Sequence, residues 1–348
     1  MRSVLSIAAL AVSTLALSAC GSGGGNASRD FVRAVGSSTL YPFATVVAES
    51  TAKSAGIKSP VIESTGTGAG MKLFCAGVGA AHPDIENASR RMKASEYAEC
   101  AKNGVDKVIE IQVGLDGIAF AEAQGGPGMT LTPVDVYKAL AANPFGKPNT
   151  AKTWADVNPA LPAIPILVYG PPSTSGTRDA LAELILAKGC DTDPAMKALK
   201  KSDEGRHKEI CNRIREDGAY VEAGENDNLI VQKLGANPDA IGVLGFSFLE
   251  RNLDTIRDVP IDGVMATYQT ISDFSYPASR PLFIYVKAQH VKAIRGLREF
   301  LDEYTSERAW GPGGYLQRRG LVPAPDGVRA ENRVRAAELT PLTKGDLE

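Results

Sequence analysis

The stretch YGPPSTSGTRDALAEL, residues 169–184, joins a short apolar run to a segment whose pattern predicts a helix. Small hydroxyl side chains and one glycine, residues 173–177, lie where this helix would begin. The first backbone N–H groups of a helix have no intrahelical partner and carry the positive end of the helix dipole. The stretch therefore allows three interpretations: a helix cap, a nucleophilic serine, or a binding site for an anion.

The same order of apolar strand, Gly/Ser/Thr turn and helix occurs twice earlier, in FVRAVGSSTLYPF (residues 31–43) and VIESTGTGAGMK (residues 61–72). Strands that alternate with helices predict an α/β fold with a largely parallel sheet. For a single turn, a helix cap is the ordinary explanation. Three turns, each with more hydroxyls than a cap requires, favour one shared anion site.

An enzyme is the less favoured interpretation. The G-x-S-x-G pattern of a nucleophilic serine is absent around Ser175. A serine hydrolase also needs a histidine, and His82, His207 and His290 lie in no patterned site, so we expect all three at the surface. The segment GTGAGMK has neither the dinucleotide-binding nor the P-loop spacing.

The N-terminus predicts export. Arg2 precedes an apolar run at residues 4–17, which is too short to span a membrane and is typical of a signal peptide. The tetrapeptide LSAC looks like the lipobox of bacterial lipoproteins, which implies cleavage before Cys20 and acylation of that residue. A simple secretory signal is the alternative. We expect an extracytoplasmic, periplasmic protein that a lipid anchors to the membrane.

The chain has five cysteines. With Cys20 assigned to lipid, the remaining four favour two disulfides in an oxidising compartment. Sequence alone allows three pairings, and we favour Cys75–Cys100 and Cys190–Cys211 because each pair is local. No CxxC or HxxxH spacing is present, so we predict no metal site and no cofactor.

The 348 residues have a formal net charge of −2, without the basic field that nucleic acid would require. Two segments with glycine or proline breaks, at residues 109–122 and 276–287, are interpreted as crossings between two lobes. The predicted organisation is a signal peptide at 1–20, a flexible tether at 21–30, lobe I at 31–116 plus 280–323, lobe II at 117–279, and a peripheral C-terminal tail at 324–348.

Five segments together resemble the phosphate-binding protein family of Pst ABC importers. In order they are GSSTLYPF, GTGAGMK, DIENASRRM, STSGTRDA and DAIGVLGFSFLE. The resemblance covers most of the chain after the tether. It implies a type 2 periplasmic binding protein, in which two strands cross between two lobes and phosphate is enclosed in the cleft. It also implies a monomer that delivers phosphate to membrane permease subunits.

The resemblance implies a set of phosphate-binding residues contributed by both lobes. They are Ser38, Thr39, Leu40, Thr67, Ser89, Arg90, Ser175, Gly176, Thr177 and Arg178. Asn226 is a further candidate at the edge of the cleft, although a helix cap is the simpler interpretation.

Two positions depart from the family pattern. Arg90 stands where many members have an aspartate, and Pro171 stands where they have an arginine. We expect Arg178 to supply the guanidinium, since its fork can give two parallel hydrogen bonds to an oxyanion. Asp116 can replace the missing proton acceptor or can simply form a turn between glycines. Phosphate is therefore the expected ligand, with sulfate, molybdate or another oxyanion as the alternative, and a serine hydrolase or phosphatase as a third.

Overall fold

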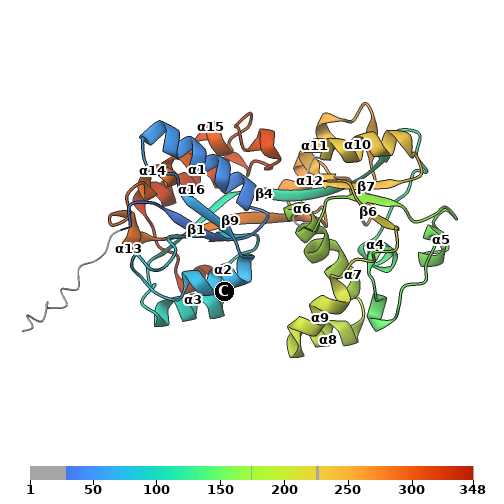
Figure 1. The fold of residues 1–348 in the computed structure, drawn as a ribbon, viewed down its shortest axis with the longest axis horizontal. Helices are drawn as coiled ribbons and strands as arrows, with labels where there is room; N and C mark the ends of the chain where they lie inside the picture. The colour runs from blue at the N-terminus through green and yellow to red at the C-terminus, as the bar shows by residue number, and fades with distance from the viewer. Residues whose placement is uncertain (1–28, 174, 225–226, 348) are drawn as a thin grey trace, which may run out of the picture.

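The computed structural model describes residues 29–173, 175–224 and 227–347, and it shows two α/β lobes side by side (Figure 1). Two antiparallel strands, β4 (Val108–Ala123) and β9 (Ser279–Lys287), run from one lobe into the other. Asp116 lies opposite Arg280 where they cross. The predicted pair of crossing strands is thereby confirmed. The signal peptide, Cys20 and Asn226 lie outside the described residues.

The strands follow the order β2-β1-β3-β9-β4-β7-β5-β6, and β8 pairs with β4. The strands of lobe I are β1 (Arg33–Gly36), β2 (Val61–Ser64) and β3 (Ile85–Ala88). Those of lobe II are β5 (Val168–Gly170), β6 (Tyr220–Glu222), β7 (Ile241–Gly245) and β8 (Ile256–Asp258). The β1 and β5 strands pair in parallel with their neighbours, whereas β4 and β9 pair antiparallel. The predicted parallel pairing therefore holds for β1 with β2 and β3 and for β5 with β6 and β7, whereas every pairing with β4 or β9, including that of β8, is antiparallel.

Helices cover both faces of the sheet in each lobe (Figure 1). Those of lobe I are α1 (Tyr41–Ala55), α2 (Thr67–Phe74), α3 (Ala94–Lys102), α13 (Ala288–Val291), α14 (Leu297–Tyr304), α15 (Glu307–Trp310), η3 (Gln317–Arg319), α16 (Asp326–Glu338) and η4 (Lys344–Leu347). Those of lobe II are α4 (Pro133–Leu140), η1 (Pro144–Gly146), α5 (Trp154–Val157), α6 (Gly176–Ala180), η2 (Leu181–Leu186), α7 (Ala187–Cys190), α8 (Pro194–Ser202), α9 (Glu204–Cys211), α10 (Asp227–Ala236), α11 (Phe246–Arg251) and α12 (Tyr268–Ser272).

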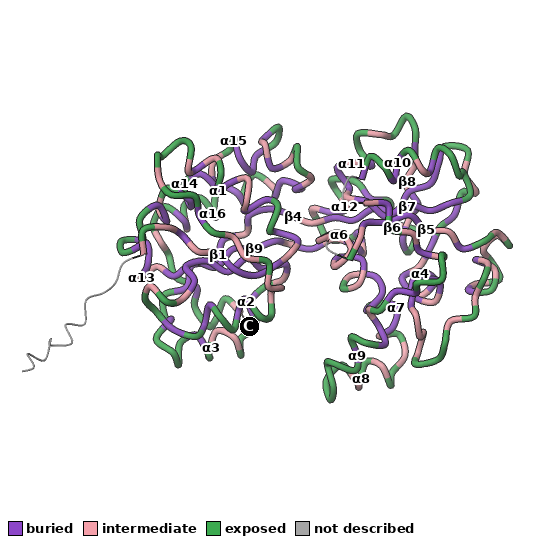
Figure 2. Tube along the Cα trace, in the orientation of Figure 1, coloured by how far each residue is buried: buried purple, intermediate pink, exposed green. Residues whose placement is uncertain are grey.

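Each lobe has its own hydrophobic interior. One cluster fills lobe II around Trp154, and two clusters lie in lobe I, one around Phe300 and the other around Phe74. The crossing strands β4 and β9 are largely buried, whereas the edge strand β2 is partly exposed (Figure 2). Both predicted disulfides are confirmed, Cys75–Cys100 in lobe I and Cys190–Cys211 in lobe II. Each lobe thus has its own core, as a separate domain does.

The C-terminal segment 324–347 corrects the expectation of a peripheral tail. Helix α16 packs against β4, and Asn332 Oδ1 accepts a hydrogen bond from the Gln112 amide at 2.7 Å. Ala336 and Leu342 are almost fully buried, and the Leu342 amide donates to Val108 O at 2.6 Å. The segment contributes few apolar side chains and is rich in charge, so its composition concealed that it completes lobe I.

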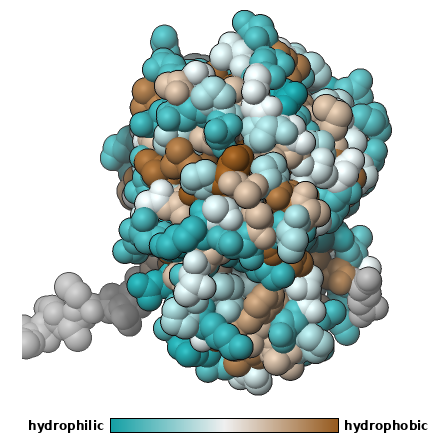
Figure 3. Space-filling view, turned by 90° about the vertical axis from the view of Figure 1, so that its right-hand side faces the viewer, coloured by the Kyte–Doolittle hydropathy of each residue, from teal (hydrophilic) through white to brown (hydrophobic). Residues whose placement is uncertain are grey.

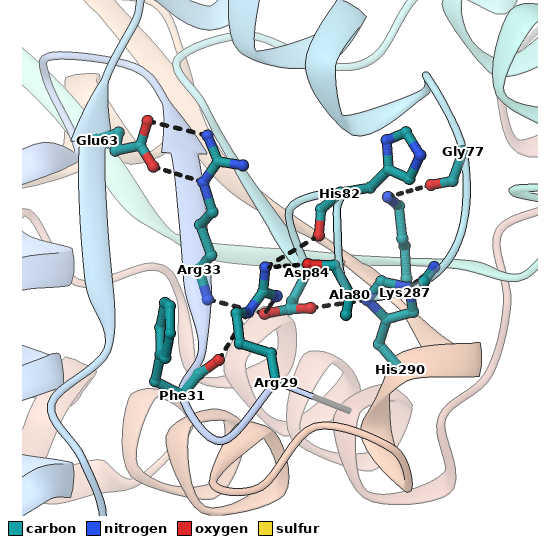
Figure 4. A network of polar contacts seen from close by, with 11 residues as sticks. Arg29, Phe31, Arg33, Glu63, Gly77, Ala80, His82, Asp84, Lys287 and His290 are labelled. Carbon is teal, nitrogen blue, oxygen red and sulfur yellow. Dashed lines mark hydrogen bonds and ion pairs between the residues drawn. The ribbon is translucent and has the colours of Figure 1, made fainter. Parts of the chain in front are cut away.

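A buried polar network holds the start of the described chain against lobe I (Figure 4). The Arg29 guanidinium donates to Asp84, whose other carboxylate oxygen lies 2.7 Å from His290 Nδ1. Lys287 Nζ donates to Gly77 O at 2.6 Å nearby, and burial lowers the pKa of this lysine to about 7. His290 is thus a buried structural residue, and the expectation of a surface histidine was wrong.

The outer face of lobe II is mostly hydrophilic, with hydrophobic groups gathered across its middle (Figure 3). Among the described residues, none of the helices combines the length and the apolar character that crossing a membrane requires.

Candidate functional site

The first predicted turn connects β1 to α1 in lobe I. Gly36 ends β1 with a φ of 124°, and a Cβ there would lie 2.2 Å from Asn87 O, so only glycine fits. The Ser37 amide donates to Asn87 O at 2.7 Å, and the Thr39 amide donates to Ser37 Oγ at 3.2 Å. The Leu40 amide, at the N-cap of α1, donates to no described residue. The turn therefore offers hydroxyls and an unpartnered N–H group.

The predicted turn at residues 173–177, in lobe II, leads from β5 into the continuous helix formed by α6, η2 and α7. Ser175 caps this helix, since its Oγ accepts a hydrogen bond from the Thr177 amide at 3.2 Å. The Gly176 amide donates to no described residue. Cap and donor thus occur in the same turn, as the sequence predicted for residues 173–177; Thr174 itself lies outside the described residues.

The two turns touch each other. A Cβ on Gly176 would lie 2.4 Å from Thr39 Cα and 2.9 Å from Thr39 N, and Thr39 Oγ1 lies 3.4 Å from Gly176 O. A cleft of about 570 Å³ opens beside this contact. Its lining includes Ser38, Thr39, Asp116, Ser175, Gly176 and Thr177. The structure thus brings together residues that are more than 130 positions apart in the chain.

Arg280 lies at the back of the contact, on the crossing strand β9. Its Nη2 donates to Thr39 Oγ1 at 3.0 Å, and its Nε donates to Asp116 Oδ2 at 3.1 Å. Its Nη1 donates to Glu183 of the lobe II helix. Burial raises the pKa of Asp116, and the positive charge of Arg280 opposes that rise. One guanidinium therefore contacts both crossing strands and both lobes.

Arg178 is not placed where the sequence analysis expected it. Its guanidinium lies 4.2 Å from the centre of the Tyr220 ring and within 3.9 Å of Glu222. The arginines that line the cleft are Arg318 and Arg319 of η3, whereas Arg280 lies behind Thr39. A cation over an aromatic face is a stable arrangement. The structure therefore does not support the expected guanidinium role of Arg178, and Arg280 is the arginine at the two turns.

Thr67, Ser89 and Arg90 line a second pocket, of about 540 Å³, between α2 and the helices α7–α9. Thr67 Oγ1 lies 3.1 Å from Ser89 Oγ and accepts from the Ser89 amide at 3.1 Å. Arg90 donates through both Nη atoms to Glu96, at 2.9 and 2.7 Å, and this pairing raises the pKa of Arg90. The predicted residues thus form two groups that line two pockets, and Arg90 is paired with Glu96.

Three residues of this region were missed by the sequence analysis: Asp179, Glu183 and Arg280. The only sequence signal for Arg280 is a basic residue at the start of an apolar strand, opposite GLDG on the other crossing strand. Asp179 and Glu183 read as ordinary acidic residues in the first turns of a helix. Their positions depend on how the lobes meet, which a local pattern does not contain.

In the described part of the chain, one group of potential metal ligands lies within 4.8 Å, formed by Cys190, His207 and Cys211. Its two sulfurs are joined in a disulfide, which leaves His207, and that imidazole lies 2.7 Å from Asp191. This group is therefore a structural element of lobe II in the oxidised protein. His207 is buried, contrary to the expectation of a surface position.

Comparisons with known proteins agree with this architecture. A family model described as a PBP superfamily domain matches residues 21–308. Protein SphX of Synechococcus elongatus is 31% identical over 309 residues, which cover 86% of this chain and 79% of SphX. The phosphate-binding protein PstS of Staphylococcus saprophyticus is 30% identical over 297 residues, covering 83% of this chain and 81% of PstS. The crystal structure of a possible phosphate binding protein from Planctomyces limnophilus is 25% identical, with a TM-score of 0.72 over 89% of this chain and 98% of that chain.

Proposed function

Because the chain belongs to the PBP superfamily, in the family of PstS and SphX, we propose that it binds inorganic phosphate between its lobes. The observation that carries the proposal is the contact of Thr39 with Gly176, which joins two hydroxyl-rich turns from opposite lobes. Hydroxyls and backbone N–H groups bind an oxyanion without adding charge. Arg280, which is buried behind the turns, adds a positive charge next to Thr39.

The donors belong to Ser38, Thr39 and Leu40 in lobe I and to Ser175, Gly176 and Thr177 in lobe II. Thr67, Ser89 and Arg90 belong to the wall of the cleft that closes over the ligand. Because the ligand contacts both lobes, phosphate stabilises their closed arrangement in proportion to its differential affinity for it. Arg280 replaces Arg178 in this proposal, since its guanidinium reaches Thr39.

Asp116 is the proposed proton acceptor that distinguishes hydrogen phosphate from sulfate. It lines the cleft, and its carboxylate needs only one of its oxygens for Arg280. Sulfate carries no proton at neutral pH, so a carboxylate that faces it brings two hydrogen-bond acceptors together. This arrangement disfavours the binding of sulfate. Asp116→Asn is expected to raise the affinity for sulfate relative to phosphate.

The protein acts as a binding component and not as an enzyme in this proposal. Ser175 Oγ is engaged in capping α6, while His207 and His290 each pair with an aspartate elsewhere. The bound phosphate is passed to the membrane subunits of an ABC importer. We further propose that a lipid on Cys20 anchors the monomeric protein to a membrane outside the cytoplasm. Mass spectrometry of the N-terminal peptide tests for this lipid.

The proposal is tested by calorimetry of the purified protein with phosphate, sulfate and molybdate. We expect phosphate to bind best, and we expect Arg280→Gln to weaken it at least 30-fold, since a hydrogen bond to a charged group contributes about 2 kcal/mol. Arg178→Gln is the matched control and should bind as the wild type does. Tight binding of sulfate without any phosphate heat would exclude phosphate as the ligand.

A further inference from the structure

Two carboxylates of lobe II contact groups of lobe I that the proposed function assigns to phosphate. Asp179 of α6 accepts a hydrogen bond from Ser38 Oγ, and Glu183 of η2 accepts one from Arg280 Nη1. We propose that Asp179 and Glu183 are internal competitor anions, which occupy the phosphate site in the ligand-free protein and which phosphate must displace. This inference rests on the proposed function.

The contact of Ser38 with Asp179 is exclusive. A serine hydroxyl has one O–H donor, and here that donor points to the aspartate. Phosphate can use Ser38 Oγ as a donor only after Asp179 has given it up. Burial raises the pKa of Asp179, the hydrogen bond from Ser38 lowers it, and the negative charge of Glu183 raises it further. The two carboxylates therefore repel each other where they lie.

In the contact between Arg280 and Glu183, the arginine side chain is held in place and the glutamate side chain is free to move away. The Arg280 side chain is 7% exposed and is held by Asp116 on the neighbouring strand, whereas the Glu183 side chain is 53% exposed. The glutamate can therefore rotate into water without disturbing the crossing strands. Arg280 Nη2 meanwhile remains on Thr39 Oγ1, at 3.0 Å, and keeps the guanidinium beside the turn.

The helix that carries both carboxylates has a local irregularity. Asp179 and Glu183 are four residues apart and therefore neighbours on one helix face. The segment Leu181–Leu186, which includes Glu183, has π-helical hydrogen bonding. Single wide turns of this kind occur frequently at functional sites. Asp179 thus faces Ser38 while Glu183 reaches the crossing strand, and together they cover the donors of lobe I.

Displacement follows from charge. Phosphate at neutral pH carries one to two negative charges, and like charges in a shared site disfavour each other. Binding must therefore push both carboxylates toward solvent. The internal anions lower the apparent affinity, because a ligand whose binding-competent state is only partly populated binds more weakly by that fraction.

The test uses the full-length mature protein with Asp179→Asn, Glu183→Gln and the double variant. Inorganic phosphate is titrated by calorimetry, and thermal unfolding checks that each variant folds. We expect about a threefold to tenfold gain in phosphate affinity for each single variant and a larger gain for the double variant. Glu209→Gln is the matched control, because it removes one lobe II carboxylate that pairs with Arg206 on the exposed face of α9. Its affinity should stay at the wild-type value.

An affinity that falls or stays unchanged in the two single variants and in the double variant would overturn the inference, since the carboxylates would then support the site or take no part in it. If neither the wild type nor any variant binds phosphate, the proposed function fails. Small-angle scattering of the ligand-free proteins then decides the remaining point: a larger radius of gyration in the double variant supports the contact between carboxylates and lobe I, and an equal radius refutes it.

Discussion

Gly176→Ala tests whether the two turns must touch for phosphate to bind. The added Cβ would lie 2.4 Å from Thr39 Cα and 2.9 Å from Thr39 N, which are backbone atoms of the other lobe. Carbon atoms in ordinary contact are about 3.5–4.0 Å apart. The lobes must therefore separate by about 1 Å or more at this point, because neither backbone can rotate away as a side chain would.

A separation of this size is large for the site. The contact of Thr39 Oγ1 with Gly176 O, at 3.4 Å, is already near the limit of a hydrogen bond and would be lost. One anion could no longer receive short hydrogen bonds from both turns. We expect at least a tenfold loss of phosphate affinity, or about 1.4 kcal/mol. The free energy of unfolding should stay equal or fall slightly, because the hydrogen bond between the turns is lost while each lobe keeps its own core.

Calorimetry with phosphate and chemical unfolding measure the two quantities on the same protein. The control is Gly327→Ala, in the first turn of α16, where nothing lies within 4 Å of the new Cβ. That variant should match the wild type in affinity. If Gly176→Ala binds phosphate within twofold of the wild type, the contact between the turns is not required, and the geometric basis of the proposed site is refuted.

Three further predictions concern stability. Burial raises the pKa of Asp258 from 3.8 to about 7, so between these pH values the folded protein keeps a proton that the unfolded chain has lost. The free energy of unfolding should therefore fall as pH rises from about 4 to 7. Asp258→Asn should abolish that fall when unfolding is measured across this range. Leu342→Ala should lower the free energy of unfolding by about 2–4 kcal/mol in denaturant titrations, because Leu342 is buried, whereas exposed Val334→Ala should change it little. Replacing Cys190 and Cys211 together by serine should cost about 3 kcal/mol by the same measurement, since their disulfide closes a loop with a sequence separation of 21.

Local sequence patterns predicted much of the fold. The turns after β1, β2 and β5 were found because glycine and hydroxyl residues interrupt an apolar run just before a helix. Both disulfides were found because local pairs are the simplest pairing of four cysteines. These features depend on residues close together in the chain, and a single sequence contains that information.

The arginine of the site could not be found in the same way. Arg280 comes next to Asp116 only through the register of β4 with β9, across 164 residues. Arg178 was expected at the site because it follows the turn, but its guanidinium lies over the ring of Tyr220 from another strand. The C-terminal helix was misjudged for a related reason: its packing against β4 uses polar contacts such as that of Asn332, which composition cannot distinguish from solvent exposure.

The position of the cation changes how the two lobes can respond to an anion. An arginine on a turn would belong to one lobe, and with the lobes apart its charge would be available only to a ligand bound to that lobe. Arg280 lies on a strand that both lobes share and is paired with Asp116 on the other crossing strand. If the lobes close as proposed, Arg280 stays at the crossing strands while the lobes exchange their contacts with it. Glu183 is such a contact in lobe II and Thr39 is its counterpart in lobe I. In the proposed function, an anion displaces Glu183 and keeps the contact with Thr39. The contact between the two lobes then becomes a contact of both lobes with the ligand, and this exchange would couple binding to closure.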